Sequence, residues 1–320
     1  MWIKETEGER EMPQKLYPSA HILEMFMPYL HDEKRLIDVL RRIADMGFYR
    51  NVELPSFPGK ENRAVVRDIL EKYDLTCITY VAPFLNEQGM SLCDLDAERR
   101  GKVIDFLKYH ADLAAECGYT TFGIPSGKDP GEALRPDALK AEADTLSRMA
   151  DYVAQFGMNL SIEPLDRYAH KKQLIGPMDE VVEWFAPLHE AHPNAFLHWD
   201  SSHEQLSGLG IFNTLDMAAP YMSQIHLCDC INDPTHPCFG DLHMDPAEGP
   251  DWTTEGFLTP EVGAQILRQA ASYDKPEGVR RFFVSIEVLG HKGDNLWRKE
   301  RIAREFLTRC FELSGVEMAS

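Results

Sequence analysis

Four residues that can carry charge stand at the ends of short apolar segments. Glu163 ends the segment 160–163, Asp200 ends 196–200, His226 ends 223–226 and Glu287 ends 284–287. Carboxylates removed from water in this way repel one another, and they require either a raised pKa or a cation. Three carboxylates and one imidazole suit Mn²⁺, Mg²⁺, Co²⁺ or Zn²⁺. We therefore predict that these four residues bind one divalent ion, with Mn²⁺ as the first expectation. The alternative is that each is a buried polar residue in an ion pair.

This predicted ligand set has a definite chemical use. A metal ion flanked by Glu163 and Glu287 is suited to removing a proton from a carbon beside a carbonyl, through a metal-stabilised enediolate. If the two glutamates act on opposite faces of that carbon, the result is isomerisation or epimerisation of a carbohydrate. If the neighbouring carbon carries a leaving group, the same chemistry gives a lyase or dehydratase, with His203 or His243 as the acid. A non-catalytic sugar-binding protein is a third interpretation.

Other residues are candidates for the same site. His203 follows Asp200 by three residues, and Asp241 and His243 lie in a long segment rich in Pro, Gly, Asp and His. We predict His203 and His243 as catalytic residues and His203 and Asp241 as substrate-binding residues. Phe84 and Trp252 are predicted to wall a sugar pocket. Glu53 also follows an apolar segment, but it lies outside the predicted ligand set.

The elements that must position these residues alternate along the chain. Strand-like apolar segments alternate with segments whose apolar residues recur at helical spacing. The predicted strands cover residues 21–26, 51–54, 75–81, 120–124, 158–163, 194–200, 222–226 and 282–287. Eight such units in 320 residues predict a single closed (β/α)₈ TIM barrel of the α/β class, with an open doubly wound sheet as the alternative. Residues 1–18 are predicted to be a polar N-terminal arm, residues 19–320 the barrel, and residues 229–260 a long loop after the seventh strand.

Composition restricts the partners. The chain has 33 Lys and Arg against 52 Asp and Glu, a net charge of −19, which opposes binding to nucleic acid. The N-terminal residues lack the apolar core of a secretory signal, and no apolar run approaches the ~18 residues of a membrane span. The seven cysteines are odd in number and scattered, which favours reduced thiols in a cytoplasmic protein. A small carbohydrate or glycoside is the expected partner, without nucleic acid or membrane.

At these residues the sequence resembles the xylose-isomerase-like barrel superfamily of sugar isomerases, epimerases and abasic-site endonucleases, from Ser19 to Leu313. The resemblance implies that Glu163, Asp200, His226 and Glu287 hold a metal at the ends of strands five to eight. It also implies that His203, in the Asp-x-x-His spacing that starts at Asp200, contacts substrate. Residues 163–168 resemble the same segment of ketohexose 3-epimerases. A homo-oligomer is a further implication of the resemblance.

The sequence also departs from those epimerases. Ala169 stands where they usually carry a glutamate, and Asn232 stands where they carry an arginine, so the substrate clamp differs. Residues 233–243 resemble catalytic subunits of enzymes that deglycosylate oxidised C-glycosides, which implies the lyase alternative and a small second subunit. The endonucleases use additional histidines after strands two and three, and this chain lacks them there. Asp241-x-His243 does match the endonuclease pattern, which leaves a second metal ion open.

Overall fold

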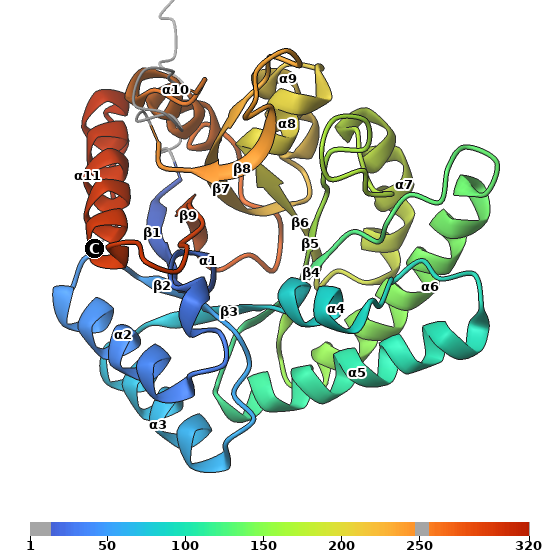
Figure 1. Cartoon of the computed structure of the whole chain (residues 1–320), viewed down its shortest axis with the longest axis horizontal. Helices are drawn as coiled ribbons and strands as arrows, with labels where there is room; N and C mark the ends of the chain where they lie inside the picture. The colour runs from blue at the N-terminus through green and yellow to red at the C-terminus, as the bar shows by residue number, and fades with distance from the viewer. Residues whose placement is uncertain (1–13, 247–255, 320) are drawn as a thin grey trace, which may run out of the picture.

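The structure is a computed structural model, and it describes residues 14–246 and 256–319. Its centre is a closed ring of eight parallel strands (Figure 1). Neighbours in sequence pair from β1 to β7, and β9 closes the ring by pairing with both β7 and β1. This closure confirms the predicted (β/α)₈ barrel and excludes the open sheet. The strands are β1 Leu16–His21, β2 Asn51–Leu54, β3 Thr76–Tyr80, β4 Thr121–Pro125, β5 Asn159–Glu163, β6 Ala195–Asp200, β7 Met222–Ile231 and β9 Phe282–Glu287.

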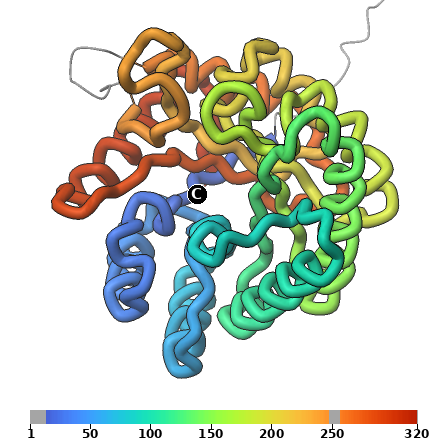
Figure 2. Tube along the Cα trace, turned by 45° about the vertical axis from the view of Figure 1, so that its right-hand side comes forward, coloured from blue at the N-terminus to red at the C-terminus, as the bar shows by residue number. Residues whose placement is uncertain are grey.

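Helices surround this ring, as Figures 1 and 2 show. The longer ones are α2 Glu33–Met46, α3 Lys60–Lys72, α5 Ala97–Glu116, α6 Arg135–Ala154, α7 Met178–Ala191, α9 Ile211–Ala218, α10 Pro260–Ala270 and α11 Leu296–Ser314. The short ones are α1 Ile22–Met25, η1 Met27–Tyr29, α4 Ala82–Gln88 and α8 Ser201–Ser207. Among the described residues, none of the helices combines the length and the apolar character needed to cross a membrane.

Helix α2 illustrates why these segments fold as they do. The Asp32 side chain accepts a hydrogen bond from the backbone N–H of Arg35 and so caps the first turn. One face, which includes Leu36, Leu40 and Ile43, is buried against the rest of the core. Gly47 ends the helix with a φ of 65°, a left-handed conformation that glycine adopts without a Cβ penalty. Apolar stripes of this kind hold the helices against the outside of the barrel and leave the carboxyl ends of the strands for the site.

The first strand differs from the prediction. Residues 21–26 were expected to form it, but β1 covers Leu16–His21, and α1 follows immediately. Pro18 lies inside β1, and a proline usually argues against a central strand because it has no N–H to donate. The apolar residues of α1, Ile22, Leu23 and Met25, are buried in the core. The barrel therefore begins before the expected boundary at Ser19, and residues 1–13 of the predicted arm lie outside the described residues.

The connection after β7 contains regular structure. Strand β8, Gly240–Met244, pairs antiparallel with the last part of β7. Gly240 has a φ of 113°, and a Cβ at this position would lie 2.7 Å from Cγ of His170. Glycine thus allows β8 to approach the connection between β5 and α7 closely. The hairpin carries Asp241 and His243, while residues 247–255 of the predicted loop lie outside the described residues.

Candidate functional site

A cavity of about 1010 Å³ lies at the carboxyl end of the barrel. Its lining includes Glu163, His203, Asp241, His243 and Glu287, which come from four different parts of the chain. In (β/α)₈ enzymes this face carries the active site, because the loops that follow all the strands meet there. The cavity is therefore the candidate active site.

Four potential metal ligands converge at this cavity. Glu163, Asp200, His226 and Glu287 each offer one ligand atom, and these atoms all lie within 4.8 Å of one another. Asp200 and His226 are buried, whereas Glu163 and Glu287 also line the cavity. The structure therefore brings together the four residues that strand-end position singled out. We call them the donor tetrad.

The hydrogen bonds of the tetrad leave room for a cation. Oδ1 of Asp200 accepts hydrogen bonds from the backbone N–H groups of Ser202 and His203, at 2.8 and 3.2 Å, and so caps α8. Among the described residues, neither Oδ2 of Asp200 nor Oε1 of Glu163 has a hydrogen-bond partner, although both atoms are buried. Buried oxygens without partners are costly, and a divalent cation would satisfy both. The donor set thus fits a hard or borderline divalent ion.

The electrostatics of Glu163 agree with this interpretation. Burial is the largest influence and raises the pKa of Glu163 to about 8, with the negative charge of Glu287 adding to the effect. Burial also raises the pKa of Asp200. Carboxyl groups that resist ionisation when they are crowded together become favourable ligands once a cation balances their charge.

His226 is oriented by a carboxylate that lies outside the tetrad. Its Nδ1 lies 2.8 Å from Oε2 of Glu287, and its Nε2 lies 2.7 Å from Oε2 of Glu53. Both ring nitrogens face carboxylate oxygens, so without a metal ion each donates a hydrogen bond, Nδ1–H to Glu287 and Nε2–H to Glu53; a metal ion at Nδ1 would displace the first of these protons and leave the second. Ser19 donates to the other oxygen of Glu53 at 2.6 Å. Metal-binding histidines commonly donate their second N–H to a carboxylate in this way, which fixes the ring orientation.

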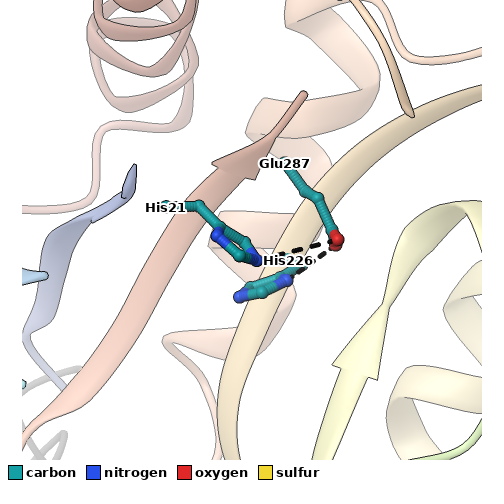
Figure 3. Close-up of side chains that lie close together, drawn as sticks. All are labelled: His21, His226 and Glu287. Carbon is teal, nitrogen blue, oxygen red and sulfur yellow. Dashed lines mark hydrogen bonds and ion pairs between the residues drawn. The ribbon is translucent and has the colours of Figure 1, made fainter. Parts of the chain in front are cut away.

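His21 completes this buried cluster (Figure 3). Its Nδ1 accepts from the backbone N–H of Glu24 at 3.3 Å, and its Nε2 lies 3.7 Å from both Glu53 Oε2 and Glu287 Oε1. Burial alone would raise the pKa of Glu53, but His226 and His21 outweigh it and lower this pKa to about 2.

Sequence reasoning missed both of these residues. Glu53 carried a usable signal, since it lies near the end of an apolar segment like the tetrad residues. His21 carried none, because it was placed at the start of a strand rather than at its end.

The three other polar residues predicted for the site lie beside the tetrad. His203 Nε2 is 3.9 Å from Oε1 of Glu163, and His243 Nδ1 is 3.2 Å from Oε1 of Glu287. Asp241 is buried between these histidines, with its Oδ2 2.7 Å from His243 Nε2 and 3.9 Å from His203 Nε2. Burial opposes protonation of His203, but Asp241 and Asp166 outweigh it and raise the pKa of His203 to about 9. His203 can therefore present a proton to the cavity at neutral pH.

The two aromatic predictions have different outcomes. Contrary to the prediction, Phe84 does not line the cavity, although its neighbours Pro83 and Leu85 do. Phe84 points away from the cavity and stacks on His110, with ring centroids 5.0 Å apart. Consecutive residues of a helix such as α4 face different directions, so only part of this segment can line the cavity. Trp252 lies outside the described residues.

One wall of the cavity depends on a buried carboxyl group. Gly127, in the connection between β4 and α6, donates its backbone N–H to Glu142 of α6, at 2.9 Å from Oε1 and 3.2 Å from Oε2. Gly127 and the following Lys128 line the cavity. Glu142 is fully buried, and burial raises its pKa to about 8. The protonated form of Glu142 therefore holds this wall in place.

This arrangement makes stability depend on pH. In the folded protein Glu142 keeps its proton up to about pH 8, whereas in the unfolded chain it loses the proton near pH 4.3, approximately. The folded state thus binds more protons in this window, and the free energy of unfolding falls as pH rises through it. Glutamine is neutral at every pH. We therefore expect the free energy of unfolding of Glu142→Gln to fall less with rising pH than that of the wild type, by up to about 1.4 kcal/mol per pH unit. Urea unfolding of both proteins at pH 5 and pH 8 measures these free energies.

Exposed Glu132 provides the control variant Glu132→Gln. If the free energies of unfolding of Glu142→Gln and wild type change in parallel with pH, Glu142 is not protonated in the folded protein.

Comparisons of the sequence and the fold with known proteins identify the family of this chain. The chain is 28% identical over 182 residues to an L-ribulose 3-epimerase of Methylomonas sp. (strain DH-1), a match that spans 53% of this chain but only 58% of that relative's length. A D-psicose 3-epimerase with D-tagatose, from Clostridium cellulolyticum H10, has the same fold, with a TM-score of 0.65, 13% identity, and coverage of 95% of this chain and 100% of that chain. An AP endonuclease, family 2, from Brucella melitensis gives a TM-score of 0.62 at 18% identity, over 88% of this chain and 96% of that one. The profile of the xylose isomerase-like TIM barrel family matches residues 40–257, more than half of the sequence. The chain therefore belongs to the xylose isomerase-like TIM barrel family.

Proposed function

We propose that this protein is a carbohydrate epimerase or isomerase that uses one divalent metal ion, with Mn²⁺ preferred over Mg²⁺, Co²⁺ and Zn²⁺. The observation that carries the proposal is the pair Glu163 and Glu287. Both carboxylates reach the cavity, and both belong to a tetrad whose ligand atoms lie within 4.8 Å of one another. The similarity to an L-ribulose 3-epimerase supports a sugar substrate.

The positions of the two glutamates around the ring support action on opposite faces of a sugar. Glu163 ends β5 and Glu287 ends β9, and these strands are separated around the ring by β6 and β7 on one side and by β1 to β4 on the other. One carboxylate can therefore remove a proton from the carbon beside the carbonyl while the other returns a proton to the opposite face. Removing a proton from one face and returning a proton to the other inverts the configuration of that carbon, which is an epimerisation.

The remaining residues of the site orient and polarise the substrate. A divalent ion held by the tetrad would supply positive charge for the sugar oxygen on which negative charge develops. In this proposal His203 and His243 donate protons to sugar oxygens; their contacts with Asp241, at 3.9 and 2.7 Å, support this role. With a net charge of −19 on the chain and several carboxylates around the cavity, a neutral sugar fits better than a polyanion.

The lyase alternative receives no support from these comparisons. The relatives named above are epimerases and an endonuclease, and none of their names describes a lyase. The endonuclease has 18% identity, which shows a shared fold only.

The proposal is tested by the proton transfer itself. The Mn²⁺-loaded protein should exchange a carbon-bound hydrogen of a ketose with deuterated water, as observed by NMR or mass spectrometry. L-Ribulose, D-psicose, D-tagatose and D-fructose form the initial panel. Absence of exchange across a broad ketose panel, with metal loading verified, would overturn the proposed function.

Glu53 provides a test of the metal site that does not depend on turnover. Glu53→Gln retains the size of the side chain but replaces the charged acceptor of His226 Nε2–H. Loss of such an orienting carboxylate typically lowers metal affinity about 10- to 100-fold, and we expect the same for Mn²⁺ here. Calorimetric titration of Mn²⁺ into metal-free protein measures the affinity. Exposed Glu61 on α3 supplies the control Glu61→Gln, and an unchanged affinity in Glu53→Gln would refute the positioning role.

A further inference from the structure

Lys171 places an ammonium group in the wall of the cavity beside the tetrad. It lies in the connection between β5 and α7, lines the cavity, and its side chain is 29% exposed. Its Nζ lies 2.8 Å from Oδ2 of Asp241, a carboxylate with no exposed side-chain surface. Burial by itself would lower the pKa of Lys171, but Asp241 outweighs it and raises this pKa. Nothing in the sequence pattern singled out this residue.

The hydrogen-bond geometry leaves part of the ammonium group free. His243 Nε2 lies 2.7 Å from the same Asp241 oxygen and 3.1 Å from Lys171 Nζ. An unprotonated Nε2 would direct its lone pair at the carboxylate, so Nε2 carries a proton and donates it to Asp241. Nε2 then cannot accept from Lys171. A lysine ammonium has three N–H groups, and one is used on Asp241. Among the described residues, Nζ contacts only Asp241 and His243, so at least one N–H remains available to a ligand in the cavity.

Both ends of Lys171 are fixed before any ligand binds. Its backbone N–H donates to the carboxylate of Asp166, at 3.0 Å from Oδ1 and 3.2 Å from Oδ2. Oδ2 of Asp166 also lies 3.4 Å from Nδ1 of His203, the residue whose other nitrogen approaches Glu163. Asp166 and Asp241 therefore position Lys171 and His203 together. Donors that are held in place in advance lose little freedom when they bind an oxygen.

We propose that Lys171 is a substrate-binding residue whose ammonium group donates hydrogen bonds to a hydroxyl or carbonyl oxygen of the sugar next to the reacting carbon. This inference rests on the proposed function, because it places the sugar at the tetrad. It also bears on the question of a second metal ion. Lys171 already supplies positive charge at Asp241, which disfavours a second divalent ion there.

The first test compares sugar binding by variants loaded with Mn²⁺. Lys171→Met removes the charge at similar length, and Lys171→Arg keeps the charge. The matched control is Lys172→Met at the exposed neighbouring position. Isothermal calorimetry with L-ribulose, D-psicose, D-tagatose and D-fructose should show binding about 10- to 100-fold weaker in Lys171→Met. Lys171→Arg should recover part of this loss, while the control and the Mn²⁺ affinity stay unchanged.

A second comparison separates contact with the sugar from simple neutralisation of Asp241. In the Asp241→Asn background, Lys171→Met should still weaken sugar binding, because the lost contact is with the ligand. If Lys171 only balances the charge of Asp241, the substitution has no effect in that background, and the inference is overturned.

The remaining outcomes also decide between the two proposals. Unchanged binding by Lys171→Met, or two tightly bound Mn²⁺ ions per wild-type chain by elemental analysis, overturns the role of Lys171. Mn²⁺-loaded wild-type protein that binds no ketose of a broad panel overturns both proposals. Binding that depends on Lys171 without any deuterium exchange supports the role of Lys171 and overturns the epimerase function alone.

Discussion

Replacing either Glu163 or Glu287 with glutamine is expected to lower turnover by at least about a thousandfold. The substitution retains the volume and one oxygen donor, but it removes the negative charge and the proton acceptor. Loss of general acid–base catalysis typically costs ~10²–10⁴ in rate, and weaker electrostatic stabilisation of the developing charge adds to this loss. Both residues reach the cavity and therefore the substrate.

Turnover of a responsive ketose measures the effect, with Mn²⁺ in excess so that weaker metal binding does not limit the rate. Glu132→Gln, on the exposed surface near α6, is the control and should retain full activity. Glu53→Gln is unsuitable for that purpose because Glu53 contacts His226. Near-normal turnover in both Glu163→Gln and Glu287→Gln would show that these residues are buried ion-pair partners rather than proton-transfer groups.

Removal of the metal ion is expected to abolish activity and to lower stability. An ion that binds the folded state alone contributes about 2.7 kcal/mol at a concentration 100 times its Kd, so chelation should lower the melting temperature. Without the ion, Glu163 holds its proton up to about pH 8, and metal binding must displace that proton. Affinity for Mn²⁺ should therefore rise with pH, up to at least about pH 8.

Calorimetry at pH 6.5 and pH 8.5, in buffers of different ionisation enthalpy, measures both the affinity and the proton release. Activity should return when Mn²⁺ is added to chelated protein. Full activity in protein that elemental analysis shows to be free of metal would rule out a metal-dependent reaction. A Mn²⁺ affinity that does not change with pH would contradict the assignment of Glu163 as a protonated ligand in the free protein.

The sequence by itself determined the barrel and the tetrad. Alternating strand-like and helical segments predict parallel strands joined by helices, and all parallel strands of a barrel end on the same face. A residue at a strand end therefore has its place in the fold set by local pattern alone. This is why Glu163, Asp200, His226 and Glu287 were identified together, and why the structure brings them within 4.8 Å of one another.

Only the tertiary structure decided which other residues join them. Glu53 and His21 reach His226 and Glu287 because β1 pairs with β9 on one side and with β2 on the other in the closed ring, and Pro18 had concealed β1 itself. Lys171 meets Asp241 because an antiparallel hairpin folds over the end of β7. The directions of such loop and hairpin side chains are set by packing between segments distant in sequence, and local periodicity carries no information about that packing.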